Sequence, residues 1–235
     1  MSSLQNDFGQ PIGPPVPDWR PAKPPSPILL TGRFCSLERM DAAKHARTIY
    51  DIQKHDDDSR WTYLGYGPFR DFTSYHCWME EYAGFEDPFF FTVLEKASGQ
   101  PIGVLSYLRI TPIYGTIEIG GINFSGRMQR QPASTETIYL LIKHAFENLG
   151  YRRVEWKCDA NHALSRRAAL RYGFQFEGIF RQHLMYKGRN RDTAWFSIID
   201  SEWPGIKESF EQWLAPDNFD EQGKQKATLS QLRGS

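Results

Sequence analysis

The chain has 235 residues, of which 40% are hydrophobic and 14% aromatic, and its 28 basic residues balance its 28 acidic ones. This length suits one large domain with tails or two small domains, and the composition favours one soluble domain. Because the formal net charge is zero, no overall field attracts nucleic acid or a membrane surface, and we expect neither as a partner.

Two further features restrict the compartment and the chemistry. The sequence lacks a run of about 18 apolar residues, and its first residues lack the charged-then-apolar plan of a signal peptide. Cys35, Cys77 and Cys158 are odd in number and far apart, which argues against a disulfide framework and a zinc site. We therefore expect a cytoplasmic protein with buried free thiols and no metal.

Proline marks residues 1–27 as an extended arm. Eight prolines lie between positions 11 and 27, and a residue without an N–H is unsuited to the interior of a helix or sheet. The arm could bind a proline-recognising module or lie on the domain as a strap anchored by Trp19. We expect the domain at residues 28–214 and a polar, mobile C-terminal tail at residues 215–235.

The first part of the domain is predicted to contain a strand at residues 28–37, a helix at 41–54 and a second helix at 71–82. Three aspartates at 56–58 are typical of a solvated loop rather than a metal site. The loop at 61–69 is less ordinary, because it combines large amphipathic rings with two glycines and a proline. Its aromatic residues either wall a substrate pocket or pack on the core, and they are Trp61, Tyr63, Tyr66 and Phe69.

Three strands follow, at residues 89–95, 101–110 and 115–124, and the short turns between them predict an antiparallel meander. From Thr135 the apolar period becomes helical and continues to Leu149, where Gly150 occupies the position of a C-terminal stop.

Residues 154–178 form the most structured stretch of the second half. Alternation at 154–159 predicts a strand, Asn161 a turn, and residues 165–172 a short helix that Gly173 ends before a second strand begins at Phe174. A last strand is predicted at 193–200 and a last helix at 206–214.

Three places could carry chemistry. The loop at 126–134 contains Arg127 and Arg130 and precedes a helix N-terminus, whose unpaired N–H groups can hold a phosphate or pyrophosphate. Glu118, in the third strand of the meander, and His183, beyond the second strand of the 154–178 stretch, are candidate titrating groups. Each feature alone is also common in purely structural roles.

This order of elements resembles the GCN5-related N-acetyltransferases, the GNAT superfamily, and is closest to the branch of ribosomal-protein N-terminal acetyltransferases. The resemblance extends over about residues 28–214, specifically in the second half and loosely before residue 89. It is carried by Asn161, Ser165, Arg166, Ala169, Gly173, Phe174, Glu177 and Gly178, with Thr135 and Glu136 opening the long helix and Gly150 and Tyr151 closing it.

The resemblance implies an α/β fold in which a mixed, mostly antiparallel sheet with flanking helices splays open between its fourth and fifth strands, with acetyl-CoA in the split. It implies cofactor contacts from residues on both sides of that split, namely Met128, Gln129, Arg130, Gln131, Ala133, Ser134, Thr135, Asn161, Ser165 and Arg166. The family's pyrophosphate motif has a glycine where this chain has Pro132, so one N–H donor is missing or relocated there, and Arg130 could compensate by direct charge pairing.

The reaction implied is transfer of an acetyl group from acetyl-CoA to a primary amine in a ternary complex. A main-chain N–H within residues 119–124 would polarise the carbonyl. The tyrosine acid common in the superfamily is replaced by Ala169, whereas the branch's serine is matched by Ser165, which either protonates the thiolate or merely caps its helix. Leu184 stands where that branch has a carboxylate, so Glu118 is our first candidate for the base and His183 the second.

The acceptor is a protein N-terminus or a small-molecule amine, with the 61–69 loop as its expected contact, and the acyl group could be longer than acetyl. The alternative is a regulatory or scaffold protein that binds CoA but has weak or no turnover, as the missing tyrosine and Pro132 suggest. A monomer and a homodimer are both compatible with the sequence.

Overall fold

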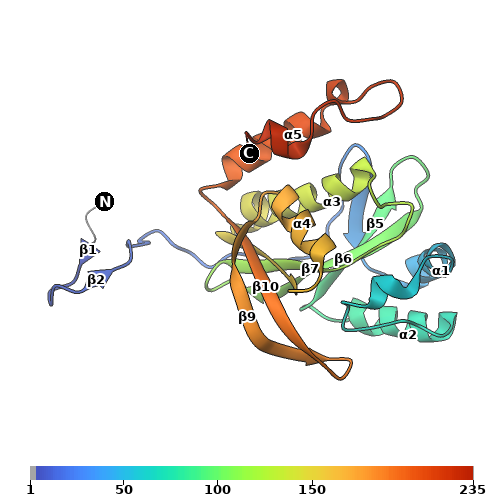
Figure 1. Ribbon diagram of the computed structural model, residues 1–235, viewed down its shortest axis with the longest axis horizontal. Helices are drawn as coiled ribbons and strands as arrows, with labels where there is room; N and C mark the ends of the chain where they lie inside the picture. The colour runs from blue at the N-terminus through green and yellow to red at the C-terminus, as the bar shows by residue number, and fades with distance from the viewer. Residues whose placement is uncertain (1–3, 235) are drawn as a thin grey trace.

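The computed structural model describes residues 4–234, so residues 1–3 of the expected arm and residue 235 of the tail lie outside it. One large sheet forms the body (Figure 1). Its strands are β3 (Leu30–Thr31), β4 (Cys35–Arg39), β5 (Phe89–Glu95), β6 (Pro101–Thr111), β7 (Thr116–Phe124), β8 (Arg153–Asp159), β9 (Gln175–Tyr186) and β10 (Arg189–Ile199), in the spatial order β3-β4-β5-β6-β7-β8-β10-β9.

Helices cover both faces of this sheet (Figure 1). They are α1 (Ala42–Gln53), α2 (Phe72–Ala83), α3 (Pro132–Lys143), α4 (Ala163–Arg171), α5 (Trp203–Leu214) and α6 (Leu229–Leu232), with short turns at Asp58–Trp61 and Pro216–Asn218 and a π-helical turn at His144–Leu149. The main core lies on the side of α3, α4 and α5, and a second core lies under α1 and α2. The predicted α/β architecture, a mixed and mostly antiparallel sheet with flanking helices, is confirmed.

The sheet is antiparallel except between β7 and β8, which pair in parallel over only a short length. Their pairs run from Thr116↔Arg153 to Glu118↔Glu155, after which residues 119–124 and 156–159 are not paired with each other. A register shift in the β6–β7 pairing accompanies Gly121, whose φ is 59°, and such a bulge bends a strand away from its neighbour. The split expected between the fourth and fifth strands is therefore present.

The predicted strand at 28–37 is instead two strands, β3 and β4, because a distant carboxylate interrupts it. The N–H of Arg33 donates to Glu136 Oε1 at 2.7 Å, and the N–H groups of Phe34 and Cys35 donate to Oε2 at 2.6 and 2.8 Å. A Cβ on Gly32 would lie 2.3 Å from Glu136 Cδ, so the turn requires glycine there. Glu136 thus ties α3 to the edge of the sheet.

Helix boundaries differ from the sequence prediction by a few residues. Helix α3 begins at Pro132 rather than Thr135, since proline is well suited to the first helical turn. Its last turn is π-helical and ends at Gly150, with a φ of 80°, as the predicted glycine stop requires. Helix α5 begins at Trp203 rather than Ile206, and β10 begins at Arg189 rather than Thr193.

The N-terminal arm contacts the domain through its last part. Trp19 Nε1 donates to the Ile113 carbonyl at 3.0 Å, and the N–H of buried Ala22 donates to the Pro112 carbonyl at 3.0 Å. Residues 4–16 project away from the body (Figure 1) and contain a small hairpin of β1 (Leu4–Gln5) and β2 (Pro11–Ile12), which the proline pattern did not predict.

Residues 215–234 are packed on the domain, which differs from the expected polar and mobile tail. Leu229 is fully buried in the main core. Arg233 donates from Nη1 to the Arg171 carbonyl at 2.9 Å and from Nη2 to the Leu170 carbonyl at 3.1 Å. The C-terminal segment therefore caps the end of α4.

Candidate active site

The aromatic loop at 61–69 contributes mainly to the second core. Trp61 is buried, its ring centroid lies 5.3 Å from that of Phe69, and Tyr66 lies 4.4 Å from Trp78. Burial raises the pKa of the Tyr66 hydroxyl well above its usual range. Of the two interpretations, core packing accounts for Trp61, Tyr66 and Phe69, although the Tyr66 hydroxyl also donates to the Gly121 carbonyl at 3.1 Å, in the unpaired part of β7.

Tyr63 differs from its neighbours because it faces the loop after β8. Its ring stacks on His162 with a centroid distance of 4.2 Å, and its hydroxyl donates to the Asn161 carbonyl at 3.4 Å. From the β9–β10 hairpin, Lys187 Nζ donates to the carbonyls of Trp61 at 2.6 Å and Tyr66 at 3.3 Å. Three loops distant in sequence thus meet beside the split.

The loop at 126–134 presents free donors, as a phosphate site requires. Met128 is fully buried and anchors the loop, and its N–H and that of Gln131 are used in turns. Among the described residues, the N–H groups of Gln129, Arg130 and Ala133 have no hydrogen-bond partner. Pro132 at the first helical position removes one donor, but these three remain, so the loop fits an anionic ligand.

Side chains around this loop hold it in place. Asp56 accepts from the Gly126 N–H at 3.1 Å and pairs with Arg60, so this part of the acidic run is structural. Arg127 pairs with Glu95 at 3.1 Å, whereas Arg130 forms no ion pair within residues 4–234.

The start of α3 is joined to the end of α4. Ser134 Oγ donates to the Gln131 carbonyl at 2.7 Å, and buried Thr135 accepts from Arg171 Nη1 at 3.0 Å. The side chains of Ser134 and Thr135, both predicted to contact the cofactor, are thus hydrogen-bonded to other groups of the protein. Arg171 brings a positive charge to this end of the split.

Ser165 lies across the split from that loop and does not cap its helix. Helix α4 begins at Ala163, and His162 is its N-cap residue, so the capping interpretation is wrong. Trp156 Nε1 donates to Ser165 Oγ at 2.9 Å, so the Ser165 hydroxyl accepts this bond and donates its own proton elsewhere. Burial raises the pKa of the neighbouring Cys158 thiol, and a hydrogen bond to Ser165 opposes that rise.

Asn161 and Arg166 lie beside Ser165. Asn161 is exposed, and Arg166 Nη1 donates to the Ala160 carbonyl at 3.3 Å while its guanidinium lies 5.6 Å from the centre of the Phe176 ring. The structure therefore brings the two predicted groups of cofactor residues to opposite sides of one split, at the ends of β7 and β8.

Glu118 lies at the last paired position of β7, where the split begins. Ile117 and Ile119 face the main core, so alternation directs Glu118 to the opposite face, that of α1 and α2. Its side chain is 4% exposed and lies 2.7 Å from Arg109 Nη1 and 3.1 Å from Lys157 Nζ. Burial raises the pKa of Glu118, and the two cations oppose that rise.

His183 lies near the same cations. Its Nδ1 is 3.0 Å from Thr193 Oγ1, and burial, followed by the charges of Arg109, Arg191 and Lys157, lowers its pKa. The buried Lys157 ammonium lies 3.7 Å from the centre of the Trp195 ring. Lys157 could have been found from the sequence, because it lies with Glu155 on the polar face of β8, where both alternate with Trp156.

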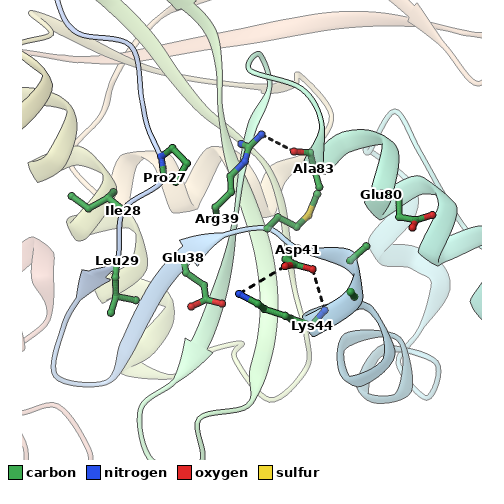
Figure 2. A pocket seen from close by; sticks show the side chains of 12 residues that line it. Pro27, Ile28, Leu29, Glu38, Arg39, Asp41, Lys44, Glu80 and Ala83 are labelled. Carbon is green, nitrogen blue, oxygen red and sulfur yellow. Dashed lines mark hydrogen bonds and ion pairs between the residues drawn. The ribbon is translucent and has the colours of Figure 1, made fainter.

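A surface groove of about 690 Å³ lies elsewhere, between residues 27–29 and the start of α1. Figure 2 shows Arg39 reaching the Ala83 carbonyl and Asp41 bonded to Lys44 in this groove. None of the predicted site residues lines it.

Comparison with known proteins identifies the family. Residues 36–175 match the model of the acetyltransferase (GNAT) domain. The chain belongs to the GNAT acetyltransferase family. The crystal structure of a GCN5-related N-acetyltransferase from Brucella melitensis is 43% identical, with a TM-score of 0.91, and the match covers 94% of this chain and 100% of that one.

Two curated relatives match part of the chain. N-acetyltransferase p20 of Bacillus licheniformis, itself uncharacterised, is 29% identical over 49% of this chain and 64% of its own length. The ribosomal-protein-serine acetyltransferase of Escherichia coli K12 is 33% identical over 43% of this chain and 56% of its own length. The chain thus spans less than two thirds of each, and what it shares with them is the acetyltransferase (GNAT) domain.

Two kinds of feature are absent from the described part of the chain. Within residues 4–234, no helix has the length and apolar character needed to cross a membrane. The same residues contain no group of three His, Cys, Asp or Glu side chains arranged to hold a metal ion.

Proposed function

We propose that the protein transfers an acetyl group from acetyl-CoA to the primary amine of a protein N-terminus or a small molecule, by direct attack in a ternary complex. The observation that carries this proposal is the split between β7 and β8, with buried Glu118 at the point where the strands separate and Ser165 on α4, beside β8. The acceptor amine must lose a proton, and the departing thiolate must gain one.

Glu118 serves as the base, through water, and its raised pKa makes it a better proton acceptor than an ordinary glutamate. The amine nitrogen bonds to the thioester carbon, the C–S bond breaks, and Ser165 protonates the sulfur. A main-chain N–H within residues 119–124, freed by the split, polarises the carbonyl.

The loop before α3 holds the pyrophosphate through the free N–H groups of Gln129, Arg130 and Ala133 and the charge of Arg130. Asn161 and Arg166 contact the pantetheine arm from the β8 side. The E. coli relative is named for acetylating serine of a ribosomal protein, which supports a protein N-terminus as the acceptor.

The decisive measurement is thiol release from acetyl-CoA across a panel of amines and peptides. We expect Glu118→Gln to lower kcat about 100-fold while the Kd for acetyl-CoA stays unchanged, because general base catalysis typically contributes about 10²–10⁴-fold. Glu208→Gln, on the polar side of α5, is the matched control. An unchanged kcat in Glu118→Gln would remove Glu118 as the base.

The alternative is a CoA-binding regulatory or scaffold protein of the same fold. Ala169 at the position of the usual tyrosine acid, together with Pro132, favours it. Tight CoA binding without amine-dependent thiol release from any member of a broad panel would support this alternative over the enzyme.

A further inference from the structure

Arg191 lies on β10 just beyond the end of β8. Thr193 is the last β10 residue paired with β8, opposite Asp159, and Arg191 is two residues further along the hairpin. Ala194 and Phe196 belong to the main core, so Arg191, Thr193 and Trp195 alternate onto the opposite face. That face also carries Glu118. The predicted cofactor residues lie on the other side of the sheet, with α3 and α4.

Arg191 is half-buried, and its guanidinium lies 5.8 Å from the centre of the Tyr186 ring but forms no ion pair with any residue between positions 4 and 234. Its one side-chain hydrogen bond runs from Nε to Thr193 Oγ1 at 3.1 Å. The neighbouring carboxylates are bound to other groups. Glu118 pairs with Arg109 and Lys157, and Glu155 pairs with Arg153 and Lys157. Asp159 accepts from the Tyr186 hydroxyl and the Asn161 N–H, and Asp192 accepts from the Asn190 amide and the Gln182 N–H. A partly desolvated cation without a counter-ion is costly, so an external anion would stabilise it.

Two further donors beside Arg191, His183 Nε2–H and Trp195 Nε1, also lack an acceptor. Thr193 is fully buried, and since its hydroxyl accepts from Arg191, its own proton needs an acceptor, which His183 Nδ1 supplies at 3.0 Å. This bond assigns the neutral His183 tautomer that carries its proton on Nε2, leaving Nε2–H as a donor. The buried Trp195 Nε1 has no partner, and its ring lies 5.9 Å from that of His183.

The cluster also lies beside the groups assigned to proton transfer. The charge of Arg191 is felt both by His183 and by the Cys158 thiol, which contacts Ser165. His183 in turn senses Arg109 and Lys157, the two partners of Glu118.

We propose that Arg191, held by Thr193 and assisted by His183 Nε2–H, binds a carboxylate of the acceptor, so that the preferred acceptor is an amine carrying a carboxylate near its reactive nitrogen. The inference rests on the proposed function and deepens it. An arginine fork matches the two oxygens of a carboxylate. The Arg191 guanidinium, His183 Nε2–H and Trp195 Nε1 are all donors, so they offer no acceptor to a cationic group. In this assignment His183 is a donor to the substrate rather than the alternative base.

The test compares acceptors that differ only in the carboxylate. One arm uses peptides with aspartate or asparagine as the second residue, and the other uses free amino acids and their amides, so the two sources of the carboxylate are distinguished. We expect the wild type to prefer the acid in at least one arm. In that arm Arg191→Gln should lower kcat/KM for the acid about 10- to 100-fold, mostly through KM, and leave the amide and the Kd for CoA unchanged.

Arg189→Gln is the matched control, because Arg189 is exposed on the same hairpin and makes no side-chain bond within the described chain. Arg191→Lys should recover part of the preference, since the charge remains without the fork. Equal losses for acid and amide, or a wild type without preference in either arm, would overturn the inference.

If no amine supports turnover, the proposed function fails and the carboxylate site is tested by binding alone. Calorimetry would then titrate the N-acetylated aspartyl peptide and N-acetylglutamate into CoA-loaded protein. Binding to the wild type but not to Arg191→Gln would support the site, and equal or absent binding would overturn it.

Discussion

At the scale of single residues, Glu136 is the most heavily used buried carboxylate in the structure. It accepts three backbone N–H groups from residues 33–35, across about a hundred positions of sequence. Glu136→Gln keeps the shape but replaces one of the two acceptor oxygens with an NH₂ group, which faces at least one of those donors.

We therefore expect Glu136→Gln to lower the free energy of unfolding by about 1–3 kcal/mol, the usual cost of leaving a buried donor unsatisfied. Urea denaturation followed by fluorescence would measure it, as a lower midpoint at constant slope. Glu221→Gln, at an exposed position in the C-terminal segment, should have no effect. A wild-type midpoint for Glu136→Gln would show that the turn does not depend on the carboxylate.

The buried carboxyl of Glu118 should determine how the rate depends on pH. As a base it must be ionised, and its pKa is raised, so kcat/KM should fall as the pH drops through a value above the usual glutamate range of about 4.3. Arg109 opposes the rise, and Arg109→Gln should therefore move this acidic limb to higher pH. Measuring kcat/KM against pH with a single acceptor, for the wild type and for Arg109→Gln, would show the shift. If the acidic limb stays at the same pH in Arg109→Gln, the group that titrates is not influenced by Arg109.

Part of the proposed site could be inferred from the sequence, and the rest could not, for a geometric reason. Glu118 and Ser165 could be found because one lies on a regular strand and the other in a motif that resembles a known family. Arg191 and Thr193 could not, because β9 and β10 pair through a register shift between these two residues, and no spacing along the chain shows which side chains that shift brings together.

At the scale of elements, the ends of the helices allow a paired test of glycine. Gly150 ends the π-helical turn with a φ of 80°, whereas Gly205 lies within α5, and a Cβ at either position would meet nothing within 4 Å. Gly150→Ala should therefore cost about 1–2 kcal/mol from backbone strain alone. Gly205→Ala should stabilise the protein by about 0.4–1 kcal/mol through the entropy of the unfolded chain.

Thermal and urea unfolding of both variants would measure these opposite signs. A shift in the same direction for both would mean that packing, rather than backbone conformation, determines the effect.

Elements with a strong local period were predicted well, and those shaped by distant contacts were not. The meander strands β5, β6 and β7 and the apolar face of α3 follow the sequence pattern closely. The 28–37 strand was wrong because Glu136, on another element, draws residues 33–35 into a turn. The start of α3 was wrong because the apolar period begins later than the helix, whose first turn Pro132 occupies.

At the scale of the whole molecule, the two ends of the chain relate to the body in opposite ways. Residues 4–16 project outward and contain the β1–β2 hairpin, and the arm first bonds to the body at Trp19. The C-terminal segment instead inserts Leu229 into the main core and caps α4, the helix that carries Ser165 and Arg166, through Arg233.

Removing residues 2–16 should therefore leave the free energy of unfolding within about 0.5 kcal/mol of the wild-type value, because surface changes usually have effects of this size. Leu229→Ala should lower it by about 2–5 kcal/mol, the range for leucine truncation in a packed core. Urea denaturation of the two variants and the wild type would separate them. Since the core that Leu229 joins also supports α4, we expect Leu229→Ala to weaken CoA binding as well, and the arm deletion to leave it unchanged. Weaker CoA binding after deletion of the arm would instead assign the projecting residues a part in the site.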